Sequence, residues 1–584
     1  MPGDIAGLKA FEVIGRLPTA SYTTDVEVTP DGKRLVWLAA KGFGSGPSNG
    51  QRPASLLFGR AGVLDRPTDE AMRAFTPSAD RQVVPANAKV APPGTPVVGP
   101  GGGASDKIEY VFYVVRENRT YDQIFGSEPR GNGDPGLQLF DDNGVPGPTG
   151  GVTPNAHALA RLFPLMDSVY ANTEESTAGH KITAGGYAND YTQRANNTQR
   201  DRKGNPDIFP IGIPPNAFVF DQAVRLSVSF RVYGELGAGN QPNANDGRPT
   251  YPQVQANTDP AYPSQVQGTC RPAVPQPPGT PNSVRCTADA GNVGTTNSAP
   301  AAMSRIRSFQ QQFEQQLATD TVPRFNYAIL FNDHTDGTVP GVYTPQANIA
   351  DNDLALGQFV ELVSQSKIWA KSAIFVIEDD SQDGLDSVDA HRIPAFVISP
   401  YAKKGAVVST RYDQYSFLRT AELISGLNPL SLNDALATPL YDAFISGNEQ
   451  PDVEGTRYRA IQPEQPLDEV NGPNAPNAKL SASLPWDKVD YVPQRIADRI
   501  LWQSVFGADS APPPPGPNAS PIERARADGA MARFRRGESP RRWLLRDSEE
   551  EDETREKVTA NLLSRGTGLT PEEAEERLEA LEGE

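Results

Sequence analysis

The stretch of this sequence with the most chemical potential is residues 374–392, where an apolar run ends in consecutive carboxylates. Glu378, Asp379 and Asp380 close the run. Further side chains of the same kinds follow shortly after: Asp383, Asp386, Asp389 and His391. Buried parallel strands read as unbroken apolar runs, and open α/β sheets place their chemistry just beyond the carboxyl ends of such strands. Because crowded carboxylates repel one another without a cation among them, the stretch predicts a metal site; the alternative is a solvated acidic loop.

Two other segments carry polar side chains directly after an apolar run. Glu117 and Asn118 follow one such run, and Asp333 and His334 follow another. Carboxylate and amide oxygens suit Mg²⁺, Ca²⁺ or Mn²⁺, and Zn²⁺ also accepts them. Each pair has an ordinary explanation by itself, because helix starts favour Glu-Asn and turns favour Asp before Gly. Their position at predicted strand ends favours a shared metal site.

A fourth segment, residues 172–186, supplies hydroxyl groups. Thr173, Ser176 and Thr177 lie here, with His180 nearby and glycines that permit tight turns. A hydroxyl becomes a nucleophile when a base or a metal ion stabilises its deprotonated form. The segment therefore predicts a metal-activated nucleophile, although a plain Ser/Thr-rich turn has the same composition.

Histidine placement supports a functional reading of these segments. The chain has only 4 histidines. His180, His334 and His391 lie within the segments described above, and His157 lies between the first two. A single histidine is usually structural, but three at or near predicted strand ends indicate a common site.

The elements that must position these side chains read as alternating strands and helices. The predicted strands cover residues 108–115, 324–331, 373–379 and 393–400. Helical periodicity begins at 157–170 and recurs at 352–366 and 415–427. This alternation predicts an α/β fold with a mostly parallel sheet and helices on both faces.

Composition changes suggest how the chain is divided. We expect a propeller-like β segment at 1–60, a linker at 61–105, an α/β domain at 106–450 with a loop-rich insertion at 190–300, a C-terminal extension at 451–508, and a Pro-rich linker with a charged helical tail at 509–584. The β segment rests on residues 24–38, which read as strand, Pro-Asp-Gly turn and strand. One such hairpin resembles a propeller blade edge but cannot form a propeller alone.

Bulk charge limits the classes of partner. The chain has 54 basic and 72 acidic side chains and a formal net charge of −18. This balance argues against nucleic-acid binding, which depends on basic side chains that neutralise phosphates. An anionic substrate would need a local cation to invert the field. We expect no transmembrane segment, because no long apolar run is present, and oligomeric state is left open.

The cysteines and the N-terminus leave the compartment open. Cys270 and Cys286 lie in a loop rich in Pro, Gly and Asn, where a local disulfide and two free thiols are both consistent with the sequence. A disulfide would favour an extracytoplasmic protein. The first residues show no charged region followed by an apolar region, so no secretory signal is predicted.

Taken in order, the four segments resemble the bacterial phosphoesterase family that includes phospholipase C-type enzymes and AcpA-like acid phosphatases, within the alkaline phosphatase superfamily. The resemblance rests on VFYVVRENRTYDQIFG, the segment ending in NTEESTAGH, FNDHTDGTVPG, ADNDLALGQFVE and AIFVIEDDSQDGLDSVDAHRIPAFVISPYAKKG. It spans about 107–446. Close members often follow a β-propeller, which would explain the hairpin.

The resemblance implies roles for individual residues. Glu117, Asn118, Asp379 and Asp380 look like ligands of a divalent metal ion of unknown identity (Ca, Mg, Mn or Zn), with Ser176 as both ligand and nucleophile. By the same resemblance, His180 and His334 look like catalytic groups that contact the phosphoryl oxygens or protonate the leaving group. Asp333, Asp383, Asp386, Asp389 and His391 are further candidates. The implied activity is metal-dependent hydrolysis of a phosphate monoester, diester or phospholipid, with sulfate esters as a related possibility.

Two positions depart from the family pattern. The family usually has Asp-Gly-His where this chain has Ala178-Gly179-His180, and it usually has His where this chain has Ser387. Losing a carboxylate and an imidazole could alter the metal or abolish turnover. The alternative function is therefore a non-catalytic binding or surface-interaction protein built on a phosphatase fold.

Overall fold

The computed structural model describes most of the first 510 residues. The described residues are 14–20, 23–40, 59–80, 90–142, 151–173, 175–189, 192, 212–235, 249–263, 270–272, 284–286, 288–290, 304–382, 384–484, 486, 492 and 494–510. The chain forms two compact units, Met1–Ala478 with Trp486–Asn518, and Lys479–Pro485 with Ala519–Glu584. The charged tail expected at 509–584 lies outside the described residues from residue 511 onward.

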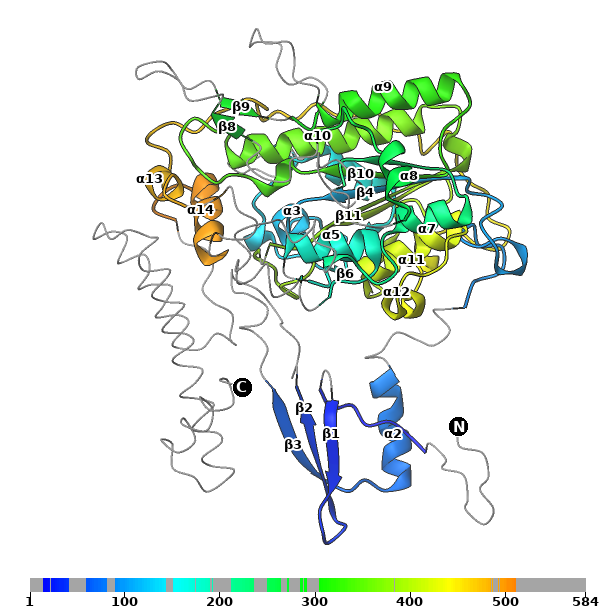
Figure 1. Ribbon diagram of the computed structural model, residues 1–584. Coiled ribbons are helices and arrows are strands. Elements are labelled where there is room, and N and C mark those ends of the chain that lie inside the picture. The colour runs from blue at the N-terminus through cyan, green and yellow to red at the C-terminus, as the bar shows by residue number, and fades with distance from the viewer. Residues whose placement is uncertain are drawn as a thin grey trace. The chain divides into compact units, whose positions relative to one another are not determined.

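A five-stranded sheet forms the centre of the first unit (Figure 1). Its order is β12 (Ala395–Ile398), β11 (Ser372–Glu378), β4 (Tyr110–Arg116), β10 (Phe325–Leu330) and β7 (Phe230–Tyr233). All neighbours are parallel except β12, which is antiparallel to β11. The strands are almost wholly buried, as their apolar sequences predict.

Register brings the ends of the three central strands level. Arg116 pairs with Glu378 of β11 and with Leu330 of β10. The residues that follow these strands therefore emerge side by side at one edge of the sheet. This edge is where the sequence places three of its four polar segments.

Helices cover both faces of the sheet (Figure 1). Helices α9 (Arg305–Ala318) and α10 (Pro345–Ser364) lie on one face, and α5 (Ser176–Gly185), α7 (Val219–Leu226) and α11 (Gln414–Ser425) lie on the other. Aromatic contacts fix the layers, because alternate side chains of a strand point to opposite faces. The Phe112 ring packs edge-on against α9 through Phe309, and the Phe375 ring packs edge-on against Phe417 of α11. The predicted α/β fold with a mostly parallel sheet is confirmed.

Shorter elements complete the described part of the chain. They are α3 (Tyr121–Phe125), α4 (Pro154–Leu162), β5 (Leu165–Met166), β6 (Val169–Tyr170), α8 (Tyr251–Ala256), β8 (Cys270–Pro272), β9 (Val284–Cys286), β13 (Val407–Val408), β14 (Tyr412–Asp413), α12 (Leu432–Leu436), α13 (Ala478–Ser481) and α14 (Gln494–Phe506). Strands β8 and β9 pair with Cys270 opposite Cys286 along the backbone. The disulfide between them stays a prediction.

The segment expected to be a loop-rich insertion differs from that expectation. Residues 190–300 contain α7, α8 and the sheet strand β7, so part of this segment belongs to the core. Strand β7 is only 4 residues long and lies at the sheet edge. So short a strand between polar stretches gives little periodic signal.

The N-terminal part forms its own small sheet. Strands β1 (Thr23–Val28), β2 (Arg34–Ala39) and β3 (Arg60–Asp65) pair antiparallel, and α2 (Asp69–Asp80) follows. The hairpin predicted over 24–38 is confirmed, whereas a β-propeller remnant is not shown. Strand β3 and α2 lie where a linker was expected, since the mostly exposed β3 carries no buried apolar pattern.

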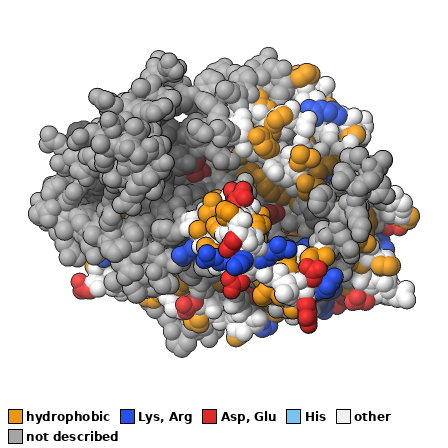
Figure 2. All heavy atoms as spheres, turned by 90° about the horizontal axis from the view of Figure 1, so that it is seen from below, with side chains coloured by type: hydrophobic (Ala, Val, Ile, Leu, Met, Phe, Trp, Pro, Cys, Tyr) orange, Lys and Arg blue, Asp and Glu red, His pale blue; other side chains and the backbone are white. Residues whose placement is uncertain are grey.

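The surface combines apolar and charged groups. Figure 2 shows orange hydrophobic side chains beside a row of blue basic ones and scattered red acidic ones on one face. Val26, Val28, Leu38 and Val63 of the small N-terminal sheet are 45–60% exposed. None of the described helices is both long enough and apolar enough to cross a bilayer.

Candidate metal centre and nucleophile

The sheet edge and one helix start assemble the predicted cluster. Glu117 and Asn118 follow β4, and Asp379 and Asp380 follow β11. The Asp379 amide donates to the Arg116 carbonyl at 2.9 Å, which continues the ladder between the two strands past the last β11 residue. All four side chains are fully buried.

Ser176, the first residue of α5, places its hydroxyl in this cluster. Its Oγ lies 3.0 Å from Glu117 Oε1 and 3.0 Å from Asp380 Oδ2. Asn118 Nδ2 donates to Asp380 Oδ1 at 2.7 Å and lies 3.4 Å from the Ser176 Oγ. The structure therefore brings Glu117, Asn118, Ser176 and Asp380 into direct contact. Ser176, rather than the adjacent Thr177, directs its hydroxyl to these groups.

Gly179 allows α5 to approach the strand end. A Cβ added to Gly179 would lie 2.1 Å from the Asp379 carbonyl oxygen. No side chain fits at that distance, so the approach requires glycine. The neighbouring His180 is thereby brought to the same carboxylates.

His180 is oriented by a residue that the sequence analysis missed. Its Nδ1 lies 3.1 Å from Oε2 of the buried Glu235, which follows β7. Its Nε2 lies 3.6 Å from Glu117 Oε2 and 3.8 Å from Asp379 Oδ2. Glu235 had the same signal as the other acids, namely a position just past a strand, but β7 was not predicted.

Several buried atoms of the cluster lack hydrogen-bond partners, within the residues that the structure describes. They are Glu117 Oε2, Asn118 Oδ1, His180 Nε2, and Asp379 Oδ1 and Oδ2. Burying such groups is costly unless something compensates them. One ligand atom each from Glu117, His180 and Asp379 lies within 4.8 Å of the others. Acidic oxygens, an amide oxygen and an imidazole nitrogen together fit a divalent cation.

Electrostatics point the same way. Burial raises the pKa of Asp379 well above its ordinary value, with Asp380 and Glu117 adding to the rise. Burial is also the main cause that raises the pKa of Asp380 to about 6. For His180, burial acts to lower the pKa, but the carboxylates around it, with Glu235 foremost, raise the pKa well above its ordinary value. These shifts show that negative charge is crowded in the buried cluster, and a divalent ion would neutralise it.

Asp333 holds the backbone of Glu117 in place beside the cluster. Its Oδ1 accepts a hydrogen bond from the Glu117 amide at 3.1 Å, and its Oδ2 pairs with Arg116 at 3.0 Å. Arg116 also pairs with Glu378 at 3.2 Å. Asp333 thus positions the chain after β4.

His334 lies beside the cluster. The Thr335 carbonyl fixes its Nδ1 at 2.9 Å, and its Nε2 lies 3.4 Å from Gln382 Nε2. The Gln382 amide also donates to Asp380 Oδ1, and the charge of His334 acts to lower the pKa of Asp380. Both observations place the imidazole close to the carboxylates. His334 is therefore linked to Asp380 through Gln382.

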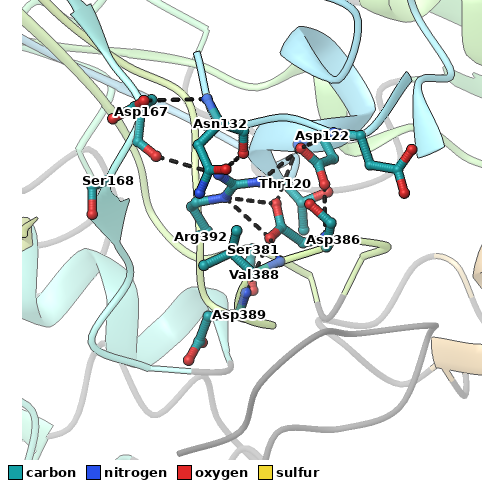
Figure 3. Close-up of polar contacts among 12 residues, drawn as sticks. Thr120, Asp122, Asn132, Asp167, Ser168, Ser381, Asp386, Val388, Asp389 and Arg392 are labelled. Carbon is teal, nitrogen blue, oxygen red and sulfur yellow. Dashed lines mark hydrogen bonds and ion pairs between the residues drawn. The ribbon is translucent and has the colours of Figure 1, made fainter. Parts of the chain in front are cut away.

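Asp386 is held in a separate ion-pair network (Figure 3). Arg392 Nε lies 3.0 Å from both Asp386 oxygens, and its Nη2 pairs with Asp122 at 2.7 Å. Both acids are buried and share this one guanidinium. Asp386 is thus engaged structurally rather than gathered with the cluster at Ser176.

The remaining sequence candidates lie apart from the cluster or outside the description. Asp389 Oδ1 accepts from the His391 amide at 2.9 Å and lies 3.0 Å from His391 Nδ1. This pair is partly exposed. Asp383 lies outside the described residues.

Comparisons with known proteins bear on the family of this chain. The model of the Phosphoesterase family matches residues 149–428 of this chain. The resemblance read from the motifs is confirmed at that level, and the chain is an enzyme of the class that hydrolyses phosphate esters. No curated protein matches the sequence.

Solved structures show only distant similarity. An alkaline phosphatase superfamily protein from Vibrio parahaemolyticus is 13% identical, with 70% of this chain and 93% of that chain covered and a TM-score of 0.35. The lipoteichoic acid synthase LtaP from Listeria monocytogenes is 11% identical, with 73% and 98% covered and a TM-score of 0.37. The phosphonate monoester hydrolase of Agrobacterium radiobacter is 12% identical, with 55% and 74% covered and a TM-score of 0.32. Such low scores carry no argument about function.

Proposed function

We propose that the chain is a metal-dependent phosphoesterase in which Ser176 is the nucleophile. The observation that carries the proposal is the position of the Ser176 Oγ, 3.0 Å from both Glu117 and Asp380, beside buried oxygens without partners. Glu117, Asn118, Asp379 and Asp380 would hold the ion. Such an ion lowers the pKa of a bound hydroxyl and neutralises charge on phosphoryl oxygens.

The chain's own groups then perform the transfer. The Ser176 proton passes to Asp380 or Glu117, and Oγ attacks phosphorus as the ester P–O bond breaks. The departing alkoxide takes a proton from His334, and a phosphoserine forms. Water attacks that phosphorus next and returns a proton to Ser176. This step releases inorganic phosphate when the substrate is a monoester, or a phosphate monoester when the substrate is a diester. Asn118 and the N-terminus of α5 favour the negative oxygens throughout.

His180 and His334 take different parts in this proposal. Glu235 holds the His180 Nδ1–H, so the Nε2 lone pair faces Glu117 and Asp379 and suits a metal ligand. This differs from the phosphoryl contact that the family resemblance implied for His180. His334 remains the candidate donor to the leaving group, because its Nε2 contacts a side chain beside Asp380.

Removing the metal tests the proposal. We expect protein stripped with EDTA to lose at least about 10²-fold in turnover of p-nitrophenyl phosphate or its bis-ester, because each electrostatic contact to the transition state contributes several kcal/mol. Separate additions of Mg²⁺, Ca²⁺, Mn²⁺ and Zn²⁺ should restore it to different degrees. The same panel with p-nitrophenyl sulfate distinguishes the ester class. Failure to hydrolyse any of these esters with every ion supplied would contradict the proposal.

The amount of metal bound per chain, measured together with turnover, distinguishes the enzyme from the non-catalytic alternative. That alternative is motivated by Ala178 and Ser387, which replace a carboxylate and an imidazole of the family pattern. Stoichiometric metal without turnover of any ester would support it. Stoichiometric metal with turnover would support the enzyme.

Exchanging Glu235 for glutamine tests the orientation of His180. We expect Glu235→Gln to weaken metal affinity by about 10- to 100-fold, as loss of a charged partner behind a metal-binding histidine does. Titration calorimetry with Mn²⁺ or Zn²⁺ measures the affinity. Glu422→Gln is the matched control, because Glu422 is a buried carboxylate that pairs with Arg419 instead. Equal affinity in both variants would remove Glu235 from the centre.

A further inference from the structure

A second group of possible metal ligands lies outside the proposed active site. It consists of Asp141, Asp142 and His157, the last on α4. One ligand atom from each lies within 4.8 Å of the others, and all three residues are buried. The Asp141 carbonyl accepts hydrogen bonds from the Val152 and Thr153 amides at 2.9 and 3.0 Å, which holds the two acids against the start of α4.

The orientation of His157 points to a ligand. Its Nδ1 lies 3.0 Å from the Thr153 carbonyl oxygen, which can only accept, so Nδ1 carries the hydrogen. The neutral ring then has its lone pair on Nε2. This atom is buried without a hydrogen-bond partner in the described structure, and it faces Asp141 Oδ1 at 3.9 Å. Metal-binding histidines commonly donate their second N–H to a backbone carbonyl in this way.

The charges around the group leave room for a cation. Arg161 donates to Asp142 at 2.6 Å and also pairs with Glu128 at 3.1 Å, and Arg130 pairs with Glu128 at 2.8 Å. No described guanidinium pairs with Asp141. His157 Nε2 and Asp141 Oδ1 are both acceptor atoms. Two acceptors then face each other, and a cation between them would relieve the repulsion.

We propose that Asp141, Asp142 and His157 bind a second divalent cation, distinct from the one at Ser176. Two carboxylates and one imidazole suit Zn²⁺ or Mn²⁺ better than Ca²⁺ or Mg²⁺. The ion would link Asp141 and Asp142 to His157 on α4. This inference does not depend on the proposed catalytic function.

The inference is tested by counting the metal ions bound to a variant that cannot hold the ion at Ser176. The full chain carrying Glu117→Gln and Asp379→Asn is stripped with EDTA, loaded with Zn²⁺ or Mn²⁺, dialysed, and measured by elemental analysis. We expect one equivalent to remain and to raise the melting temperature. Adding His157→Gln should abolish both the equivalent and the shift. His391→Gln is the matched control, because His391 also lies beside an aspartate but outside this group, and it should change neither.

Two results would overturn the inference. One is no retained ion in the double variant, and the other is an equivalent that survives in the His157→Gln protein. Circular dichroism checks that each variant is folded. Asp141→Asn provides a second route to the same loss if His157→Gln unfolds, because it leaves the packing of His157 against Phe125 intact. None of these measurements uses ester turnover, so failure of the catalytic proposal would leave them readable.

Discussion

Alanine in place of Ser176 is expected to lower kcat for a phosphate ester by roughly 10³-fold or more, with a much smaller change in KM. The reason is that the Oγ makes the bond to phosphorus, an interaction that exists only once reaction has begun. Binding of the ester to the ion and to Asn118 would persist. Steady-state kinetics of the metal-loaded protein measures both constants.

The adjacent hydroxyl provides the control for that experiment. Thr177→Ala removes a similar group from the next residue of α5, and we expect near-normal turnover. Mass spectrometry of acid-quenched reactions should find phosphate on Ser176 in the unmodified chain. Full activity in Ser176→Ala, or phosphate on Thr177, would refute the assignment of the nucleophile.

Adding a single methyl group at Gly179 should be nearly as damaging. In Gly179→Ala, the new Cβ would lie 2.1 Å from the Asp379 carbonyl oxygen, so α5 must move away from the strand end. Ser176 and His180 are on this helix and would move with it. We expect loss of at least about 10²-fold in kcat and weaker metal binding, with a stability cost of about 1–3 kcal/mol typical of overpacking.

Gly103 provides the control for the effect of adding a methyl group to a glycine. A Cβ on Gly103 would meet nothing within 4 Å, and its φ of −79° suits alanine. Gly103→Ala should therefore keep turnover, metal affinity and melting temperature. If Gly179→Ala kept all three as well, the close contact between α5 and β11 would not matter for the site.

The sheet and most of the cluster could be predicted from the sequence, because buried parallel strands are unbroken apolar runs. The runs at 108–115, 324–331 and 373–379 became β4, β10 and β11 with small shifts at their ends. Polar residues directly after such runs must emerge at one edge of the sheet. The helix expected at 352–366 begins earlier, at Pro345, after a Thr344 cap that the apolar periodicity did not reveal.

Other features depended on contacts that no local pattern encodes. Glu235 was missed because β7 is a short edge strand within polar sequence. Asp386 was grouped with the candidate site residues because composition cannot distinguish a ligand from an acid that pairs with an arginine. Arg392 lies only 6 residues away, but its pairing with Asp122 depends on the folded chain. Ion pairs between remote segments are the information that sequence spacing lacks.

The level register of β4 and β11 has an evolutionary consequence. Adjacent strands lie about 4.8 Å apart wherever they are hydrogen-bonded, so backbone pairing alone sets the separation of residues 117 and 379. Surrounding loops can lengthen, shrink or change composition without disturbing that spacing. Descendants of this chain could therefore acquire new ester preferences by remodelling peripheral segments while inheriting an unchanged reactive centre.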